Sequence, residues 1–120
     1  MQSRLDGHDG GMTADDVRGL ALALPQVVEA PHHDRTSFRV GGKIFATMPA
    51  DGASVNVLLD EEEARAAAED GAELLWWGPK VAGVRVPLAD ADADMLAELL
   101  EDGWRRRAPK ALLSELDDRR

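Results

Sequence analysis

Residues 36–48 read TSFRVGGKIFATM, two short runs of β-forming residues joined by a Gly-Gly pair. Adjacent glycines between such runs predict a two-residue hairpin loop, because both loop positions of the favoured turn need a positive φ. With Gly41 and Gly42 in the loop, the register is set by the turn. The expected cross-strand pairs are Val40 with Lys43, Arg39 with Ile44, Phe38 with Phe45, and Ser37 with Ala46.

This register would give the hairpin two different faces. Phe38 and Phe45 share one face, as an aromatic cross-strand pair of the kind that stabilises a sheet. The other face mixes polar and apolar side chains, namely Ser37, Arg39, Ile44 and Ala46. A half-polar sheet face is a place where a ligand can bind, so Arg39 is the first candidate site residue.

Patterns on both sides of the hairpin predict further elements. Thr13 is a favourable N-cap, and an apolar stripe with helical spacing begins at Val17. Asp60 and the three glutamates after it are typical of a second helix start. Residues 54–59 and 83–88 alternate in hydrophobicity, as strands do. The expected order is one helix, three or four strands, one helix, one or two strands, and one or two helices.

That order predicts an α+β fold in two layers, an antiparallel sheet with helices packed on one face. A doubly wound parallel sheet would need regular alternation of strands and helices, which the sequence lacks. We expect a single domain over residues 12–120. Residues 1–11 contain three glycines and no periodicity, and we expect them to form a disordered tail.

The composition of the chain excludes some kinds of chemistry and makes some partners less favourable. The 120 residues include 23 acidic and 14 basic side chains, for a net charge of −9, and such a protein attracts phosphate backbones poorly at long range. The chain has no cysteine, which excludes disulfides and thiolate chemistry. No apolar run is long enough to span a membrane. We expect a cytoplasmic monomer or homodimer without a membrane partner.

Six stretches, read together, resemble the MmcQ/YjbR-like family. They are LALP at 22–25, EAPH at 29–32, SFRVGGKIFAT at 37–47, WG at 77–78, the strand ending at Leu88, and WRRRAPK at 104–110. They follow the family's order over residues 13–116. The resemblance implies a two-layer α+β fold shared with CyaY and type III secretion chaperones, and members carry a DNA-binding label. It implies no catalytic residue. Many members have an aromatic residue where this chain has Val84.

Our main site hypothesis is a pocket for a carboxylate or phosphate beside the hairpin. Arg39 could hold such an anion by two parallel hydrogen bonds. The candidate ligand-binding residues are Glu29, His32, Ser37, Arg39, Lys43 and Trp77. The alternative is that Arg39 forms a surface ion pair with Glu29 or another surface acid and that Lys43 protects an exposed hairpin edge.

Trp76 and Trp77 stand before a Gly-Pro turn. Because successive strand residues face opposite ways, we expect one of them to be buried and the other exposed. The exposed one would be a suitable ligand contact, while plain packing is the simpler interpretation of the pair.

A basic cluster near the C-terminus is the alternative site. Arginine binds phosphate and an aromatic ring can stack on a base, so the candidate nucleic-acid-binding residues are Trp104, Arg105, Arg106, Arg107 and Lys110. The same cations would also complement the dipole at the end of a helix. Trp104 continues an apolar helical stripe, which favours a place in the core.

Other chemistry has little support. The sequence His32-His33-Asp34 could indicate a metal site, but adjacent histidines on a strand would point to opposite sides. Asp90, Asp92 and Asp94 are spaced as in a calcium loop, yet Met95 occupies the position that requires glycine. The start of a helix explains these aspartates better. No P-loop, dinucleotide fingerprint or nucleophile elbow occurs.

We therefore expect a non-enzymatic binding module, without a cofactor, metal or catalytic residue, that recognises a protein segment or a small anionic ligand. DNA binding through the basic cluster is the alternative, and the acidic net charge disfavours it.

Overall fold

The structure is a computed structural model that describes residues 11–119, and these follow the predicted order of elements. The elements are α1 (Ala14–Leu22), β1 (Val28–His32), β2 (Arg35–Val40), β3 (Lys43–Pro49), β4 (Ser54–Leu58), α2 (Glu61–Glu69), β5 (Glu73–Trp77), β6 (Lys80–Pro87), the short 3₁₀ helix η2 (Leu88–Asp90), α3 (Ala93–Arg107) and α4 (Lys110–Asp118). The predicted tail lies outside the described residues apart from Gly11.

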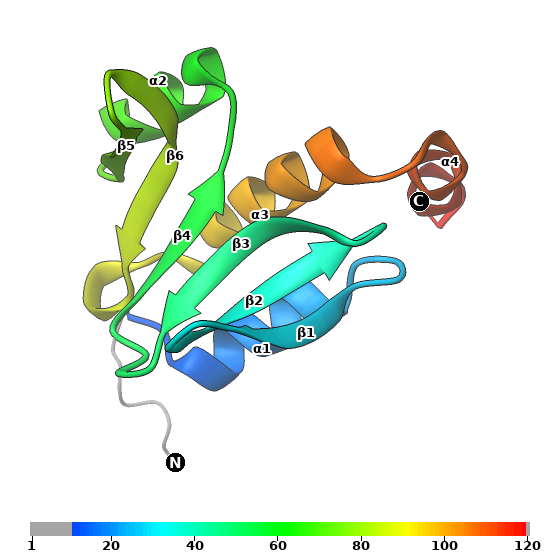
Figure 1. The fold of residues 1–120 in the computed structure, drawn as a ribbon, viewed down its shortest axis with the longest axis horizontal. Helices are drawn as coiled ribbons and strands as arrows, with labels where there is room; N and C mark the ends of the chain where they lie inside the picture. The colour runs from blue at the N-terminus through cyan, green and yellow to red at the C-terminus, as the bar shows by residue number, and fades with distance from the viewer. Residues whose placement is uncertain (1–10, 120) are drawn as a thin grey trace.

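The strands form one sheet in the order β1-β2-β3-β4-β6-β5, and every neighbouring pair is antiparallel. In Figure 1 the sheet lies in front of α1 and α3, and α4 lies beyond the end of the β2–β3 hairpin. Phe38, Val57 and Leu96 are fully buried in a single core that includes residues from the sheet and all four helices. This arrangement confirms the predicted α+β fold with helices packed on one face.

The helices begin where the sequence predicts. The Thr13 hydroxyl accepts a hydrogen bond from the Asp16 N–H at 3.2 Å, and the Asp16 carboxylate accepts one from the Thr13 N–H at 2.9 Å. Asp60 and Asp92 cap α2 and α3, each accepting a bond from the N–H three residues later. The aspartate-rich stretch is thus the start of α3, as the sequence favoured over a calcium loop.

The loop of the β2–β3 hairpin also forms as predicted. Gly41 and Gly42 have φ values of 59° and 78°, in the left-handed region that favours glycine. The two pairs nearest the loop are Val40 with Lys43 and Arg39 with Ile44. The turn therefore sets the register over its first two positions.

Beyond these pairs a β-bulge shifts the register, so two predicted pairs are wrong. Phe38 lies opposite Ala46 rather than Phe45, and Ser37 lies opposite Thr47. Phe45 is the extra residue, and the bulge lets it and Ala46 both be fully buried. Ala46 therefore belongs to the core face and not to the half-polar face.

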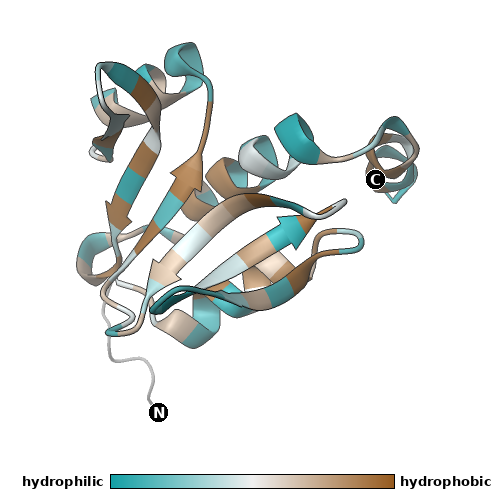
Figure 2. Cartoon of the chain, in the orientation of Figure 1, coloured by the Kyte–Doolittle hydropathy of each residue, from teal (hydrophilic) through white to brown (hydrophobic). Residues whose placement is uncertain are grey.

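The second face of the sheet is turned away from the helices. Figure 2 shows hydrophilic and hydrophobic bands alternating along β4 and β6, which is the pattern of strands with one covered face. Among residues 11–119, no helix is long and apolar enough to cross a membrane.

Candidate functional site

A row of polar residues crosses this open face of the sheet. Directly opposed positions on neighbouring strands align Ser37, Thr47, Asn56, Arg85 and Glu73. Opposed side chains point to the same side of a sheet, and the neighbours of this row along the strands, such as Phe38 and Val57, point into the core. Arg85 and Glu73, at one end of the row, form an ion pair at 2.8 Å.

A cleft of about 530 Å³ lies on the same face, and we call it the open-face cleft. The turn between β1 and β2 and its flanks form one wall, and β5 forms the other. The lining residues are His32, His33, Asp34 and Arg35 on the first wall, Trp76 and Trp77 on the second, and Ile44, Thr47, Asn56, Leu58 and Leu75 between them. The volume lies in the range of small-molecule sites.

The tryptophan wall differs from the prediction. Trp76 is 50% exposed and Trp77 is 61% exposed, so the expectation that one is buried is wrong. The cause is a bulge between Leu75 and Trp76, which breaks the alternation of an edge strand. The guanidinium of Arg65 lies 5.9 Å from the Trp76 ring centre. Two adjacent exposed indoles form a large amphipathic contact surface.

The histidine wall also differs from the prediction. His33 lies in the turn with a left-handed φ of 58°, rather than in a strand. The rings of His32 and His33 are consequently 4.5 Å apart, and the expectation that they point to opposite sides is wrong. Within residues 11–119, no group of three or more His, Cys, Asp and Glu side chains could hold a metal ion. The pair supplies ring N–H donors beside Arg35.

The floor of the cleft is mainly apolar and contains one polar group without a partner. The side-chain oxygen of Asn56 is buried and has no hydrogen-bond partner in the described part of the chain. Leaving a buried acceptor unpaired costs about 1–3 kcal/mol. A ligand that donates a hydrogen bond to Asn56 would recover that cost.

Arg39 and Ser37 lie on the open face, next to the cleft. Arg39 Nε donates to Ser37 Oγ at 2.9 Å, and Arg39 Nη2 donates to the Pro31 carbonyl at 3.3 Å. Ser37 Oγ in turn donates to the Ala30 carbonyl at 2.8 Å. These partners are neutral, so the alternative hypothesis of an Arg39–Glu29 ion pair is wrong.

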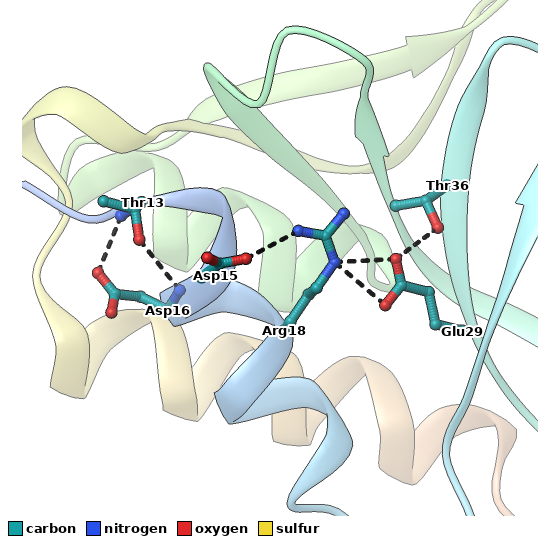
Figure 3. A network of polar contacts seen from close by, with 6 residues as sticks. All are labelled: Thr13, Asp15, Asp16, Arg18, Glu29 and Thr36. Atoms are coloured by element: carbon teal, nitrogen blue, oxygen red, sulfur yellow. Dashed lines mark hydrogen bonds and ion pairs between the residues drawn. The ribbon is translucent and has the colours of Figure 1, made fainter.

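Glu29 points to the helix side of the sheet, opposite Phe38. It accepts hydrogen bonds from Arg18 Nε at 3.0 and 3.2 Å and from the Thr36 hydroxyl at 2.9 Å (Figure 3). Its hydrogen bond and charge hold the pKa of Arg18 above the usual value. These groups border a separate hollow of about 640 Å³, but they already bond to one another.

Of the six predicted ligand-binding residues, the structure brings His32 and Trp77 together in the open-face cleft. Ser37 and Arg39 adjoin it, whereas Glu29 lies on the other face and Lys43 is exposed at the hairpin loop. Sequence reasoning missed His33, Arg35, Trp76 and Asn56 as cleft residues. Alternation along β2 could have indicated Arg35, because it shares a face with Ser37.

The C-terminal basic cluster does not form one surface. Trp104 is fully buried and its Nε1–H donates to the Pro25 carbonyl at 3.0 Å, which confirms its place in the core. Arg105 is bonded to Glu101 and Asp117, both at 2.8 Å. Bonds to Asp117 and Glu101 raise the pKa of Arg105. The remaining cations, Arg106, Arg107 and Lys110, are spread over the end of α3 and the start of α4.

The carboxyl groups of Glu63 in α2 and Asp102 in α3 lie in surroundings that disfavour their ionised forms. Burial, with the charges of Asp60 and Asp102, raises the pKa of Glu63, and the charge of Arg106 opposes this rise. Burial, with the charges of Glu98 and Glu101, raises the pKa of Asp102. A raised carboxyl pKa in the folded state means that ionisation weakens the fold.

We expect Asp102→Asn to stabilise the protein at pH 7, by less than about 1 kcal/mol because water screens partly exposed charges. The gain should shrink as the pH falls through the raised pKa and vanish below the pKa of the unfolded chain, where both states carry the proton. Urea unfolding at several pH values measures it. Glu69→Gln, at an exposed position of α2, is the control. An equal gain for both variants at every pH would contradict the assignment.

Comparison with models of protein families matches residues 22–106 to the model named YjbR. The matched segment contains the whole sheet, α2 and nearly all of α3. No curated protein and no solved structure matches the chain.

Proposed function

The chain belongs to the YjbR family, and from that premise we propose that it is a non-enzymatic module that binds a small organic anion in the open-face cleft. One observation carries the proposal. The open sheet face has two exposed tryptophans on one wall of a cleft of about 530 Å³ and two histidines with an arginine on the other.

Arg35 supplies the fixed positive charge. Among residues 11–119, no carboxylate lies within 4.0 Å of its guanidinium, although Asp34 is its neighbour in the chain. A guanidinium matches the flat, two-oxygen geometry of a carboxylate, and the imidazoles of His32 and His33 add donors on the same wall.

The rest of the cleft favours an apolar body on the ligand. Ile44, Leu58 and Leu75 form an apolar floor, and the indoles offer flat faces against which a ring can stack. Asn56 adds one buried acceptor that a hydroxyl or N–H of the ligand could satisfy. The ligand class is therefore a carboxylate with a ring-containing or branched apolar body.

We expect a panel of aryl and alkyl carboxylates to contain compounds that raise the melting temperature and quench tryptophan fluorescence. Quenching follows because Trp76 and Trp77 line the cleft. The matching primary amides should bind at least about tenfold more weakly, since a charged hydrogen bond contributes about 1.5–3 kcal/mol.

For such a carboxylate, Arg35→Ala should weaken binding about tenfold or more in titration calorimetry. Lys43→Ala is the matched control, because Lys43 is an exposed cation on the same sheet but outside the cleft. If no carboxylate binds, or if both variants weaken binding equally, the proposed site is wrong. Turnover that survives repurification and is lost in His32→Ala would overturn the non-enzymatic assignment.

A further inference from the structure

A second cleft, of about 420 Å³, lies where the β4–α2 junction, the β5–β6 turn and the end of α3 meet. We call it the arginine cleft. Its lining residues are Leu58, Leu59, Asp60, Glu61, Trp77, Pro79, Lys80, Val81, Ala82, Arg106 and Arg107. Trp77 and Leu58 also line the open-face cleft, so the two sites are neighbours.

The cations of the arginine cleft are not ion-paired to any carboxylate of the described residues. The protein has 23 acidic and 14 basic side chains, and several arginines are paired with an acid. Those with a carboxylate oxygen within 3.2 Å are Arg18, Arg65, Arg85, Arg105 and Arg119. Within residues 11–119, Lys80, Arg106 and Arg107 have no carboxylate within 4.0 Å.

The two acids that line this cleft are engaged elsewhere. Asp60 caps α2, and its Oδ1 accepts the Glu63 N–H at 2.9 Å. Glu61 forms an ion pair with Arg65 at 2.7 Å. The acids therefore leave the three cations without a direct partner.

Arg107 also has a hydrogen-bond donor without a partner among the described residues. Its Nε–H is buried and has no acceptor among the described residues. A buried donor that is part of a charged group is costly to leave unpaired. An anion in the cleft would satisfy it, and a phosphate offers oxygens for several converging N–H donors at once.

We propose that the arginine cleft binds the phosphate of a small phosphate monoester that carries a flat ring. Arg106, Arg107 and Lys80 contact the phosphate oxygens, and the ring lies against Trp77, whose indole is 61% exposed. The site differs from the open-face cleft in place and in anion. The same phosphate chemistry also occurs on a DNA backbone, so the experiment includes both sources.

The test is titration calorimetry of the full chain with 5′-AMP in 0.15 M salt, with adenosine and inorganic phosphate as the separate halves. We expect 5′-AMP to bind about tenfold or more tightly than either half. Arg107→Ala should weaken binding about tenfold or more, and Arg107→Lys should recover only part of it because a lysine lacks the fork of donors. Failure of 5′-AMP to bind would overturn the proposal.

Lys110→Ala is the matched control, because Lys110 is an exposed cation in the same part of the chain but outside the cleft. It should leave 5′-AMP binding unchanged. A short DNA duplex should bind no more tightly than inorganic phosphate. Salt-dependent duplex binding that Lys110→Ala and Arg107→Ala weaken equally would instead indicate a polyanion surface.

Crossed variants separate this site from the open-face cleft. Arg35→Ala should leave 5′-AMP binding unchanged, and Arg107→Ala should leave carboxylate binding unchanged. If Arg35→Ala weakens 5′-AMP as much as Arg107→Ala does, the phosphate occupies the open-face cleft and the inference is wrong. Circular dichroism of each variant distinguishes lost contacts from lost fold.

Discussion

Replacing Gly83 with alanine is expected to unfold the protein or to cost more than about 3 kcal/mol of stability. Gly83 lies in β6, between Leu58 of β4 and Leu75 of the edge strand β5. A Cβ atom there would fall on the Val57 carbonyl oxygen and 2.9 Å from Leu58 Cα. Its φ of 157° adds strain for any residue with a side chain.

The large effect follows because the obstruction is backbone rather than a flexible side chain. Moving β4 away from β6 would break the ladder of hydrogen bonds that joins β6 and β5 to the rest of the sheet. It would also displace Leu58, which lines both clefts. Loss of stability and loss of ligand binding should therefore occur together.

Chemical denaturation followed by circular dichroism measures this effect, and Gly19→Ala is the matched control. Gly19 is exposed within α1, and no atom lies within 4 Å of the position its Cβ would take. Alanine there should stabilise the protein by about 0.5–1 kcal/mol through helix propensity. A Gly83→Ala variant as stable as the parent would show that β4 and β6 are further apart than the structure has them.

Trp104→Ala is the second change with a large expected effect, a loss of about 3–5 kcal/mol. Trp104 is fully buried in α3, and its Nε1–H bonds to the Pro25 carbonyl, 79 residues earlier in the chain. Alanine would leave a cavity and an unpaired carbonyl between α3 and the segment that follows α1. Urea unfolding gives the change in free energy.

Two phenylalanine variants compare the buried Trp104 with the exposed Trp77. Trp104→Phe keeps much of the ring volume but loses the hydrogen bond, so it should cost about 1–3 kcal/mol. Trp77→Phe, at an exposed position, should change stability by less than about 0.5 kcal/mol. Equal costs for the two would contradict the assignment of Trp104 to the core.

The buried position of Trp104 also bears on the hypothesis of nucleic-acid binding. The DNA hypothesis needed Trp104 as a stacking surface, and the structure uses that residue to join α3 to the rest of the core. Arg105 is likewise bonded to Glu101 and Asp117. What remains of the cluster is Arg106, Arg107 and Lys110, and of these the two arginines line the arginine cleft.

The residues of the candidate site could be predicted from the sequence only in part. Alternation in β2 correctly placed Ser37 and Arg39 on the open face, because period-two alternation is a property of the strand itself. Glu29 was assigned to the wrong face of the sheet. Its neighbour Ala30 lies opposite Ser37 on the open face, so Glu29 itself points to the helix side, where it pairs with Arg18. No local pattern indicates that partner.

Patterns within short stretches of the sequence are sufficient to specify the local elements and the fold class. The caps at Thr13 and Asp60 and the glycine loop depend on residues a few positions apart, and each formed where predicted. The helix predicted after the aspartates begins beside Asp92, which is its N-cap. Family membership could likewise be read from ordered stretches of sequence.

Which side chains share a surface depends on how the strands and helices pack together. The sheet order places β6 between β4 and β5, and two bulges shift Phe45 and Trp76 out of simple alternation. The clefts arise where segments far apart in sequence meet, as His32 does with Trp77. Such meetings depend on packing and close backbone approach, which the order of residues along one strand or helix does not encode.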